Sequence, residues 1–196
     1  MNTPKKFGIG FAAFLILIFS GQKMAAQNFN LEKSVSYLKV FGTSNIHDWE
    51  LTAKDFQGNL EAQLEDGQLV EIAQLNFAVV AESLESGKSG MDKNTIKALR
   101  TDRHKLISFQ LEKVGEIKYT SKTACRLSTT GNLTIAGTRR LINLVFDAKV
   151  SPEKITLTGK HKLKMTDFKI EPPTAMFGTI TTGDEVQIEF QTVFHK

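Results

Sequence analysis

The stretch 42–51 has the sequence GTSNIHDWEL and shows the pattern on which the fold rests. In an extended chain His47, Trp49 and Leu51 fall on one side, because successive side chains of a strand point to opposite faces. Asp48 and Glu50 fall on the other side. The alternation therefore predicts a strand, entered through small residues, with an apolar inner face and a charged outer face.

The same period of two recurs along the chain, with turn signals such as Glu65-Asp66-Gly67 between the segments. A helical period occurs only over Met91–Leu99, where Asp92 lies favourably in the first turn. The clear alternating segments are 34–41, 42–51, 56–64, 69–80, 106–112, 141–150, 155–169 and 185–194, and weaker ones are 117–129 and 133–135.

About eight or nine strands and one short helix predict an all-β domain, built as one antiparallel sheet closed into a barrel or as a sandwich. The barrel is favoured, because no strand carries the proline or dense lysine that usually protects an exposed edge.

The first 26 residues have the layout of a secretory signal peptide. Lys5 and Lys6 precede the apolar run 7–19, and Ala25-Ala26 offers small residues for cleavage. An uncleaved anchor is the alternative, but the run is shorter than the roughly 20 residues that a spanning helix needs. We therefore expect a signal peptide at 1–26 and one barrel domain at 27–196, periplasmic or secreted and without a transmembrane span in the mature chain.

Net charge and cysteine content argue against two further functions, nucleic-acid binding and thiol chemistry. The net charge of +4 becomes +1 without the leader, because Lys5, Lys6 and Lys23 leave it and no acid does. A nearly neutral chain gives no support for nucleic-acid binding, which needs a clustered basic face. Cys125 is the only cysteine, so we expect a buried structural thiol rather than a reactive or intermolecular one.

The residues that could support catalysis or bind a metal are dispersed. The four histidines are His47, His104, His161 and His195, with no HxH, HExxH or CxxC spacing, so neither a metal site nor a cofactor is expected. A Ser44-His47-Asp48 triad is not expected either, because alternation sends the last two side chains to opposite faces. What remains is apolar surface. Most phenylalanines after the leader occupy strand positions, which suits either a filled core or a lined cavity.

Several blocks of the chain resemble, in order, the YceI-like proteins, a lipid- or polyisoprenoid-binding family. The blocks are GTSNIHDWEL (42–51); MDKN (91–94) leading through KAL (97–99) to ISF (107–109); GNLTIAG (131–137); and KMTDF (164–168) with PP (172–173), FGTI (177–180) and TGDEV (182–186). The resemblance implies an extended, lipocalin-like antiparallel β-barrel with an internal apolar tunnel. It also implies an exported protein, in many members a homodimer, that binds an isoprenoid quinone or another long-chain amphiphile without catalysis.

We therefore expect an exported protein that holds a long-chain isoprenoid or lipid; a filled barrel scaffold without ligand and an enzyme or haem protein using His47 are the alternatives. The expected inward residues are Trp49, Leu51, Phe77, Val79, Ile107, Phe109, Leu144, Phe146, Ile188 and Phe190. Met165, Phe168, Met176 and Phe177 are expected at an adaptable rim where a chain enters. His47 is expected to make a structural hydrogen bond, with contact to a ligand head group as the second reading.

Overall fold

The protein was analysed as a computed structural model, which describes residues 26–196. The expected signal peptide therefore lies, apart from its last residue, outside the described residues. The strands are β1 (Gln27–Leu31), β2 (Tyr37–Ser44), β3 (Asp48–Ala53), β4 (Phe56–Glu65), β5 (Gln68–Val80), β6 (Leu84–Glu85), β7 (Leu106–Ser121), β8 (Ala124–Ile135), β9 (Thr138–Ser151), β10 (Lys154–Lys164), β11 (Thr174–Ala175) and β12 (Ile180–His195). The helix is α1 (Ser89–Leu99), and four 3-10 segments are η1 (Lys33–Val35), η2 (Ala81–Ser83), η3 (Met165–Phe168) and η4 (Met176–Gly178). The predicted all-β fold with one short α-helix is confirmed for these residues.

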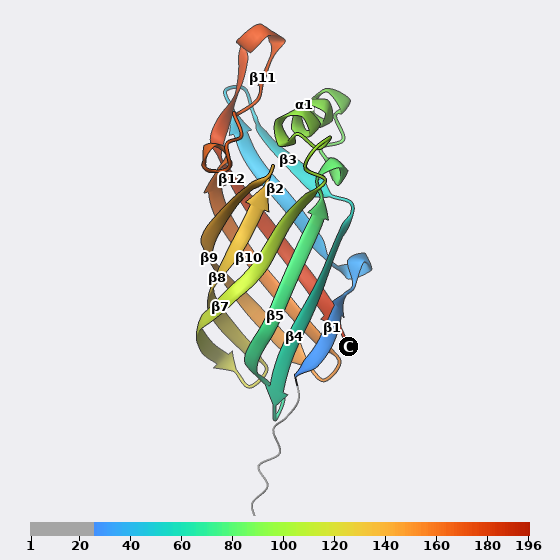
Figure 1. Cartoon of the computed structure of the whole chain (residues 1–196), viewed down its shortest axis with the longest axis vertical. Coiled ribbons are helices and arrows are strands. Elements are labelled where there is room, and N and C mark those ends of the chain that lie inside the picture. The colour runs from blue at the N-terminus through green and yellow to red at the C-terminus, as the bar shows by residue number, and fades with distance from the viewer. Residues whose placement is uncertain (1–25) are drawn as a thin grey trace, which may run out of the picture.

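The sheet closes on itself, as the barrel prediction requires (Figure 1). The order β1-β4-β5-β7-β8-β9-β10-β12 returns to β1 through the pairs Asn30–His195 and Leu31–Phe194. All of these pairings are antiparallel. The ring is uneven, because β12 changes partner along its length: from Gln191 backward it pairs with β2, which continues the sheet to β3 and β6.

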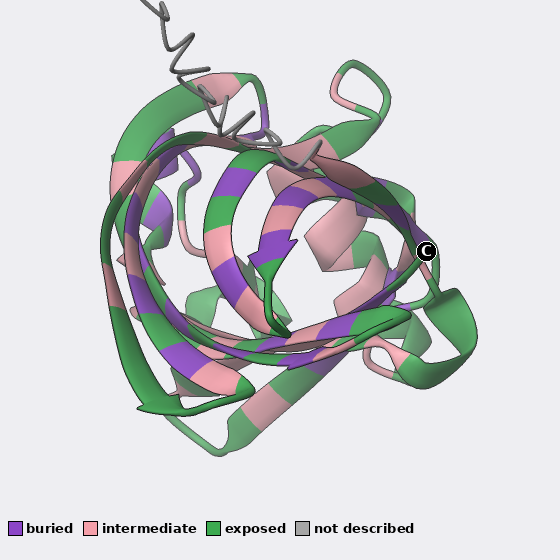
Figure 2. Cartoon of the chain, turned by 90° about the horizontal axis from the view of Figure 1, so that it is seen from below, coloured by how far each residue is buried: buried purple, intermediate pink, exposed green. Residues whose placement is uncertain are grey.

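The two ends of the barrel differ. One end, which we call the hairpin end, carries the β4–β5, β7–β8 and β9–β10 turns. The other, the helix end, carries α1, β11 and the β2–β3 turn (Figure 1). Toward the hairpin end the interior is solid. Its fully buried side chains include Phe29, Leu60, Leu127, Ile155 and Phe194. Seen from this end, buried residues alternate with exposed ones along the strands, as a closed sheet around a core requires (Figure 2).

Cys125 lies in this solid part and is almost completely buried. Burial raises the pKa of its thiol, with a smaller contribution from the negative charge of Asp147. A buried thiol held in its protonated form is a poor nucleophile. The residue therefore packs as a small apolar side chain.

Several element boundaries differ from the sequence prediction. The stretch 42–51 is not one strand, because β2 ends at Ser44 and β3 begins at Asp48. β1 was missed, because it is short and its only buried side chain is Phe29. The segments 106–112 and 117–129 are not separate strands: β7 runs to Ser121 through bulges, and β8 continues unbroken to Ile135. A β-bulge inserts one residue and shifts the alternation, which is why the pattern weakened there. Finally, β10 ends at Lys164, and the predicted strand residues 165–168 form η3, closed by Lys169 in the left-handed region with φ 58°.

Candidate ligand cavity

An apolar cavity of about 570 Å³ occupies the barrel from its middle to the helix end. Thr182 and Phe194 both line it and lie twelve residues apart in β12, a path of about 40 Å along the strand. The strands of a barrel tilt against its axis, so the cavity itself is shorter than this path. Its volume lies within the roughly 300–1,000 Å³ range of small-molecule sites. A long and narrow apolar space of this kind fits an extended hydrocarbon chain.

Aromatic rings border the cavity without filling it, because each lies over a glycine of the neighbouring strand. Phe190 lies opposite Gly159, where an added Cβ would be 2.7 Å from Cζ of the ring. Trp49 lies in the same way over Gly42, its direct partner in the β2–β3 ladder, and an added Cβ there would clash with the indole. A third ring, that of Phe109 on β7, covers a glycine of β8. With no side chain beneath them, these rings stay against the sheet, and the lumen between them remains open.

The turn that enters β3 fixes Trp49 and His47. Trp49 Nε1 donates a hydrogen bond to the Thr43 carbonyl at 2.9 Å, so the indole is held along the wall. His47 is exposed at the mouth, and its Nδ1 lies 2.9 Å from the Asp48 carbonyl oxygen, to which it can only donate. The Ser44 hydroxyl donates to the His47 carbonyl at 2.7 Å. These hydrogen bonds join side chains to backbone, and Ser44, His47 and Asp48 do not form a catalytic relay.

Helix α1 forms one side of the mouth. Met91, Thr95, Ala98 and Leu99 share a helix face, and all four line the cavity. The start of the helix is held by Asp92, whose carboxylate accepts hydrogen bonds from the backbone N–H and the hydroxyl of Ser86, both at 2.7 Å. At its end, Arg100 turns into the left-handed region and donates to the Ala136 carbonyl at 2.6 Å. The helix therefore packs on β6 and η2 and is joined to the β8–β9 turn by Arg100.

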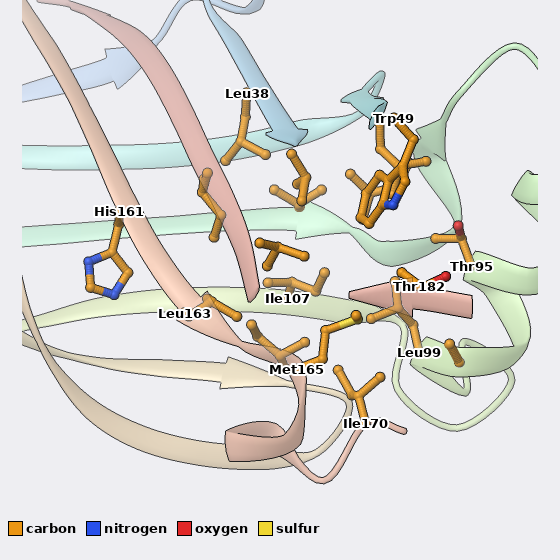
Figure 3. A pocket seen from close by; sticks show the side chains of 18 of the residues that line it. Leu38, Trp49, Thr95, Leu99, Ile107, His161, Leu163, Met165, Ile170 and Thr182 are labelled. Carbon is orange, nitrogen blue, oxygen red and sulfur yellow. The ribbon is translucent and has the colours of Figure 1, made fainter. Parts of the chain in front are cut away.

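His161 is the polar side chain that lies midway along the cavity. It points inward from β10, in phase with Leu157 and Leu163, and it follows the last β9–β10 pair, Gly159 with Phe146. The imidazole is half-buried, and burial is the only influence on its pKa among the described residues, with no hydrogen bond contributing. Burial lowers its pKa, so the ring is neutral at pH 7. Figure 3 shows His161 apart from Trp49 and Thr95, which lie toward the mouth.

Thirteen of the fifteen residues expected to bind ligand line this cavity, and whether they contact a ligand stays a prediction. They are His47, Trp49, Leu51, Phe77, Val79, Ile107, Phe109, Leu144, Phe146, Met165, Met176, Ile188 and Phe190. Phe168 is buried behind the lining, in a cluster with Ile170 and Val186, which do line the cavity. Phe177 is fully exposed at the tip of η4.

Sequence reasoning missed the contribution of α1 and of His161 to the lining. The helix was predicted, but its position across the mouth depends on long-range contacts such as that of Arg100 with the β8–β9 turn. His161 was considered only as a metal ligand. Its phase with Leu163, two residues on, was the available signal that it faces inward.

Two further properties concern residues 26–196 alone. No three histidine, cysteine, aspartate or glutamate side chains of this part gather in a way that could hold a metal ion. None of its helices has the length and apolar character needed to cross a membrane.

A closed antiparallel barrel with an elongated apolar cavity defines a class of proteins built to hold an apolar ligand inside a β-barrel. The sequence model of the YceI-like domain matches residues 27–194, and the chain belongs to this family. The resemblance predicted from the sequence blocks is thereby confirmed. A comparison with curated proteins found no match.

Solved structures share the fold at low sequence identity. BcnA of Burkholderia cenocepacia matches with 15% identity and a TM-score of 0.66, over 83% of this chain and 98% of that one. A polyisoprenoid binding domain from Saccharophagus degradans, implicated in plant cell wall breakdown, matches with 12% identity and a TM-score of 0.67, over 85% and 97%. The YCEI protein of Campylobacter jejuni matches with 18% identity and a TM-score of 0.53, over 73% and 82%.

The contact between Gly159 and Phe190 predicts the outcome of adding one methyl group. Gly159→Ala should push the Phe190 ring into the lumen, destabilise the fold by about 1–3 kcal/mol through overpacking, and weaken binding of a fluorescent long-chain alcohol about fivefold or more. Chemical denaturation and fluorescence titration measure the two effects.

Two variants control this experiment. Gly159→Ala combined with Phe190→Leu should recover binding, because the smaller side chain vacates the space. Val145→Ile adds a methyl on the exposed outer face of β9, away from the cavity lining, and should leave both quantities unchanged. Equal binding by Gly159→Ala and the unaltered chain would show that the ring does not control the lumen.

Proposed function

We propose that this protein is an exported binding protein that holds one long-chain apolar ligand, a polyisoprenoid, an isoprenoid quinone or a similar lipid, inside its barrel. The observation that carries the proposal is the elongated apolar cavity, with its aromatic rings held back against the wall by Gly42, Gly131 and Gly159. A barrel evolved as a filled scaffold has no need to place glycines beneath its largest inward side chains. Membership of the YceI-like family and the polyisoprenoid-binding neighbour support the same reading.

Binding, rather than catalysis, accounts best for the polar groups around the cavity. The His47 and Ser44 side chains are engaged with backbone groups of their own turn. The hydroxyl of Thr95 donates to the Met91 carbonyl at 3.1 Å within α1. These groups leave the mouth polar enough for an amphiphile's head while the interior suits its chain. The proposal of export rests on the layout of residues 1–26.

Extraction of the purified chain with organic solvent, followed by mass spectrometry, tests the proposal. We expect a long-chain molecule at about one per chain. Ile188 lines the cavity beside His161, its direct partner in the β10–β12 ladder. Ile188→Trp should therefore lower the recovered amount at least fivefold by filling the lumen. Val145→Trp places the same side chain on the outer face of β9 and should change nothing. Absence of any long-chain molecule, or equal recovery from both variants, would count against the proposal.

The neutral imidazole of His161 predicts a pH dependence of binding. Burial lowers its pKa from the ordinary value near 6.5, so the ring is neutral at pH 7 and gains a charge only at acid pH. A cation midway along an apolar lumen is unfavourable, and an occupying chain makes it more so. Affinity for a fluorescent long-chain alcohol should therefore be constant from pH 8 to about 6.5 and fall about tenfold as the pH drops through the pKa of His161.

The charged groups nearest His161 do not change the direction of this pH dependence. Lys160 and Lys162 flank it in β10 but point outward to Glu189 and Glu185, at 2.7 and 2.8 Å. The titratable groups of the lining other than His161 are His47 and Lys88, both at the mouth. His161→Leu should abolish the pH dependence and His47→Leu should preserve it, with circular dichroism establishing that each chain is folded at every pH. An unchanged pH profile in His161→Leu would exclude His161 as its cause.

A further inference from the structure

Three large apolar side chains are exposed at the helix end of the barrel, and we call them the rim tip: Ile46, Met176 and Phe177. Their exposed fractions are 58% for Ile46 and 69% for Met176, and Phe177 is fully exposed. Ile46 and Met176 also line the cavity, so the rim tip continues the apolar lining outward. Figure 1 shows the β11–η4 segment projecting beyond the end of the barrel that carries α1. Exposed apolar groups gathered at a cavity mouth indicate an interaction site.

Hydrogen bonds fix the two loops of the rim tip to one another. Asn45, next to Ile46, donates from its backbone N–H to the Thr181 carbonyl at 3.1 Å and from its side chain to the Thr179 carbonyl at 2.9 Å. Thr181 N–H donates in return to Asn45 Oδ1 at 3.0 Å. The β2–β3 turn and the β11–β12 segment are thereby held together. The apolar side chains of the rim tip are therefore presented by a built surface.

Backbone conformation directs the tip outward. Met176 and Phe177 have φ of 50° and 57°, in the left-handed region that side chains other than glycine rarely adopt, and Gly178 follows at 87°. Residues in such conformations persist only where the surrounding structure imposes them, and they gather at sites of function. Here the conformation places a phenylalanine in water instead of in the core.

The rim tip is uncharged. Residues 172–183 include no acidic or basic side chain, and within 40–47 the only ionisable side chain is that of His47. Such a surface can enter the headgroup region of a bilayer without removing a charge from water. On the same end of the barrel α1 exposes Lys93 and Lys97, four residues apart, together with Lys88 before it. Their positive charges would add attraction to anionic lipid.

The geometry points to the rim tip as a docking site for a phospholipid membrane, with the cavity mouth held against the bilayer. A stable protein interface needs about 1,000 Å² or more, whereas a few apolar side chains at an interface give reversible membrane binding. The docking does not depend on the ligand. Its consequence does rest on the function proposed above: a long-chain molecule would pass between bilayer and cavity without crossing water.

Co-sedimentation with vesicles tests the docking. The purified chain should bind vesicles of phosphatidylcholine with one-third phosphatidylglycerol. Met176→Ser combined with Phe177→Ser should reduce its partition coefficient about tenfold. The control is Val35→Ser, which removes a half-exposed apolar side chain from η1, away from the mouth. It should bind like the unaltered chain.

A spectroscopic readout covers the case in which the double variant folds poorly. In a Trp49→Phe background, Phe177→Trp places the only tryptophan at the tip, and its emission should shift to the blue when vesicles are added. An unshifted emission, equal partition of tip variant and unaltered chain, or binding to a protein but not to vesicles would overturn the docking proposal. The extraction experiment separates the two ideas. If lipid is extracted from the chain but the chain does not bind vesicles, the proposed function holds and the docking proposal fails. If the chain binds vesicles but no lipid is extracted from it, the docking proposal holds and the proposed function fails.

Discussion

The packing of aromatic rings on glycines of adjacent strands is the contact on which the rest of the molecule depends. Trp49 over Gly42, Phe109 over a glycine of β8, and Phe190 over Gly159 place three of the bulkiest inward side chains against the sheet. In an ordinary eight-stranded barrel, such side chains would meet across the axis and fill it. In this barrel the three rings line the lumen with apolar surface and leave its centre open. The cavity is therefore a consequence of which residue lies opposite which, and not of the number of strands.

The barrel divides its two tasks between its ends. Toward the hairpin end, side chains such as Phe29, Leu60 and Phe194 fill the interior and stabilise the fold without a disulfide. Toward the helix end, β12 exchanges β1 for β2, the ring loses its regular closure, and α1 contributes to the cavity lining. A solid half that carries stability allows the other half to stay hollow and to present an irregular, apolar mouth.

Local alternation was enough to predict much of this architecture. Within the stretch 42–51, the part that forms β3 has the faces expected of it, with Leu51 buried and Asp48 exposed, whereas Gly42–Ser44 end β2 and His47 lies in the turn between the strands. Alternation failed where bulges in β7 shift the phase, and at residues 165–168, where Lys169 turns the chain out of the sheet. Neither event changes composition enough to be seen in one sequence.

The site was harder to predict than the fold, because its decisive features join distant residues. Nothing local tells that Gly159 lies opposite Phe190 or that Arg100 holds α1 at the β8–β9 turn. Phe177 was expected at an adaptable rim in contact with a ligand, but the left-handed backbone at the tip leaves its side chain fully exposed. Residues chosen for inward phase, such as Phe77 and Ile188, line the cavity because phase is a local property.

We infer that the helix-end half of this barrel is hollow and admits one long chain. Trp49 is the only tryptophan in the chain and lies on the cavity wall, so its fluorescence reports on the lumen directly. Titration with a brominated long-chain alcohol, whose bromine atoms quench tryptophan on contact, is the most direct measurement. We expect saturable quenching at one molecule per chain, reversed by the unbrominated alcohol. Quenching that rises linearly without saturation, or none at all, would contradict it.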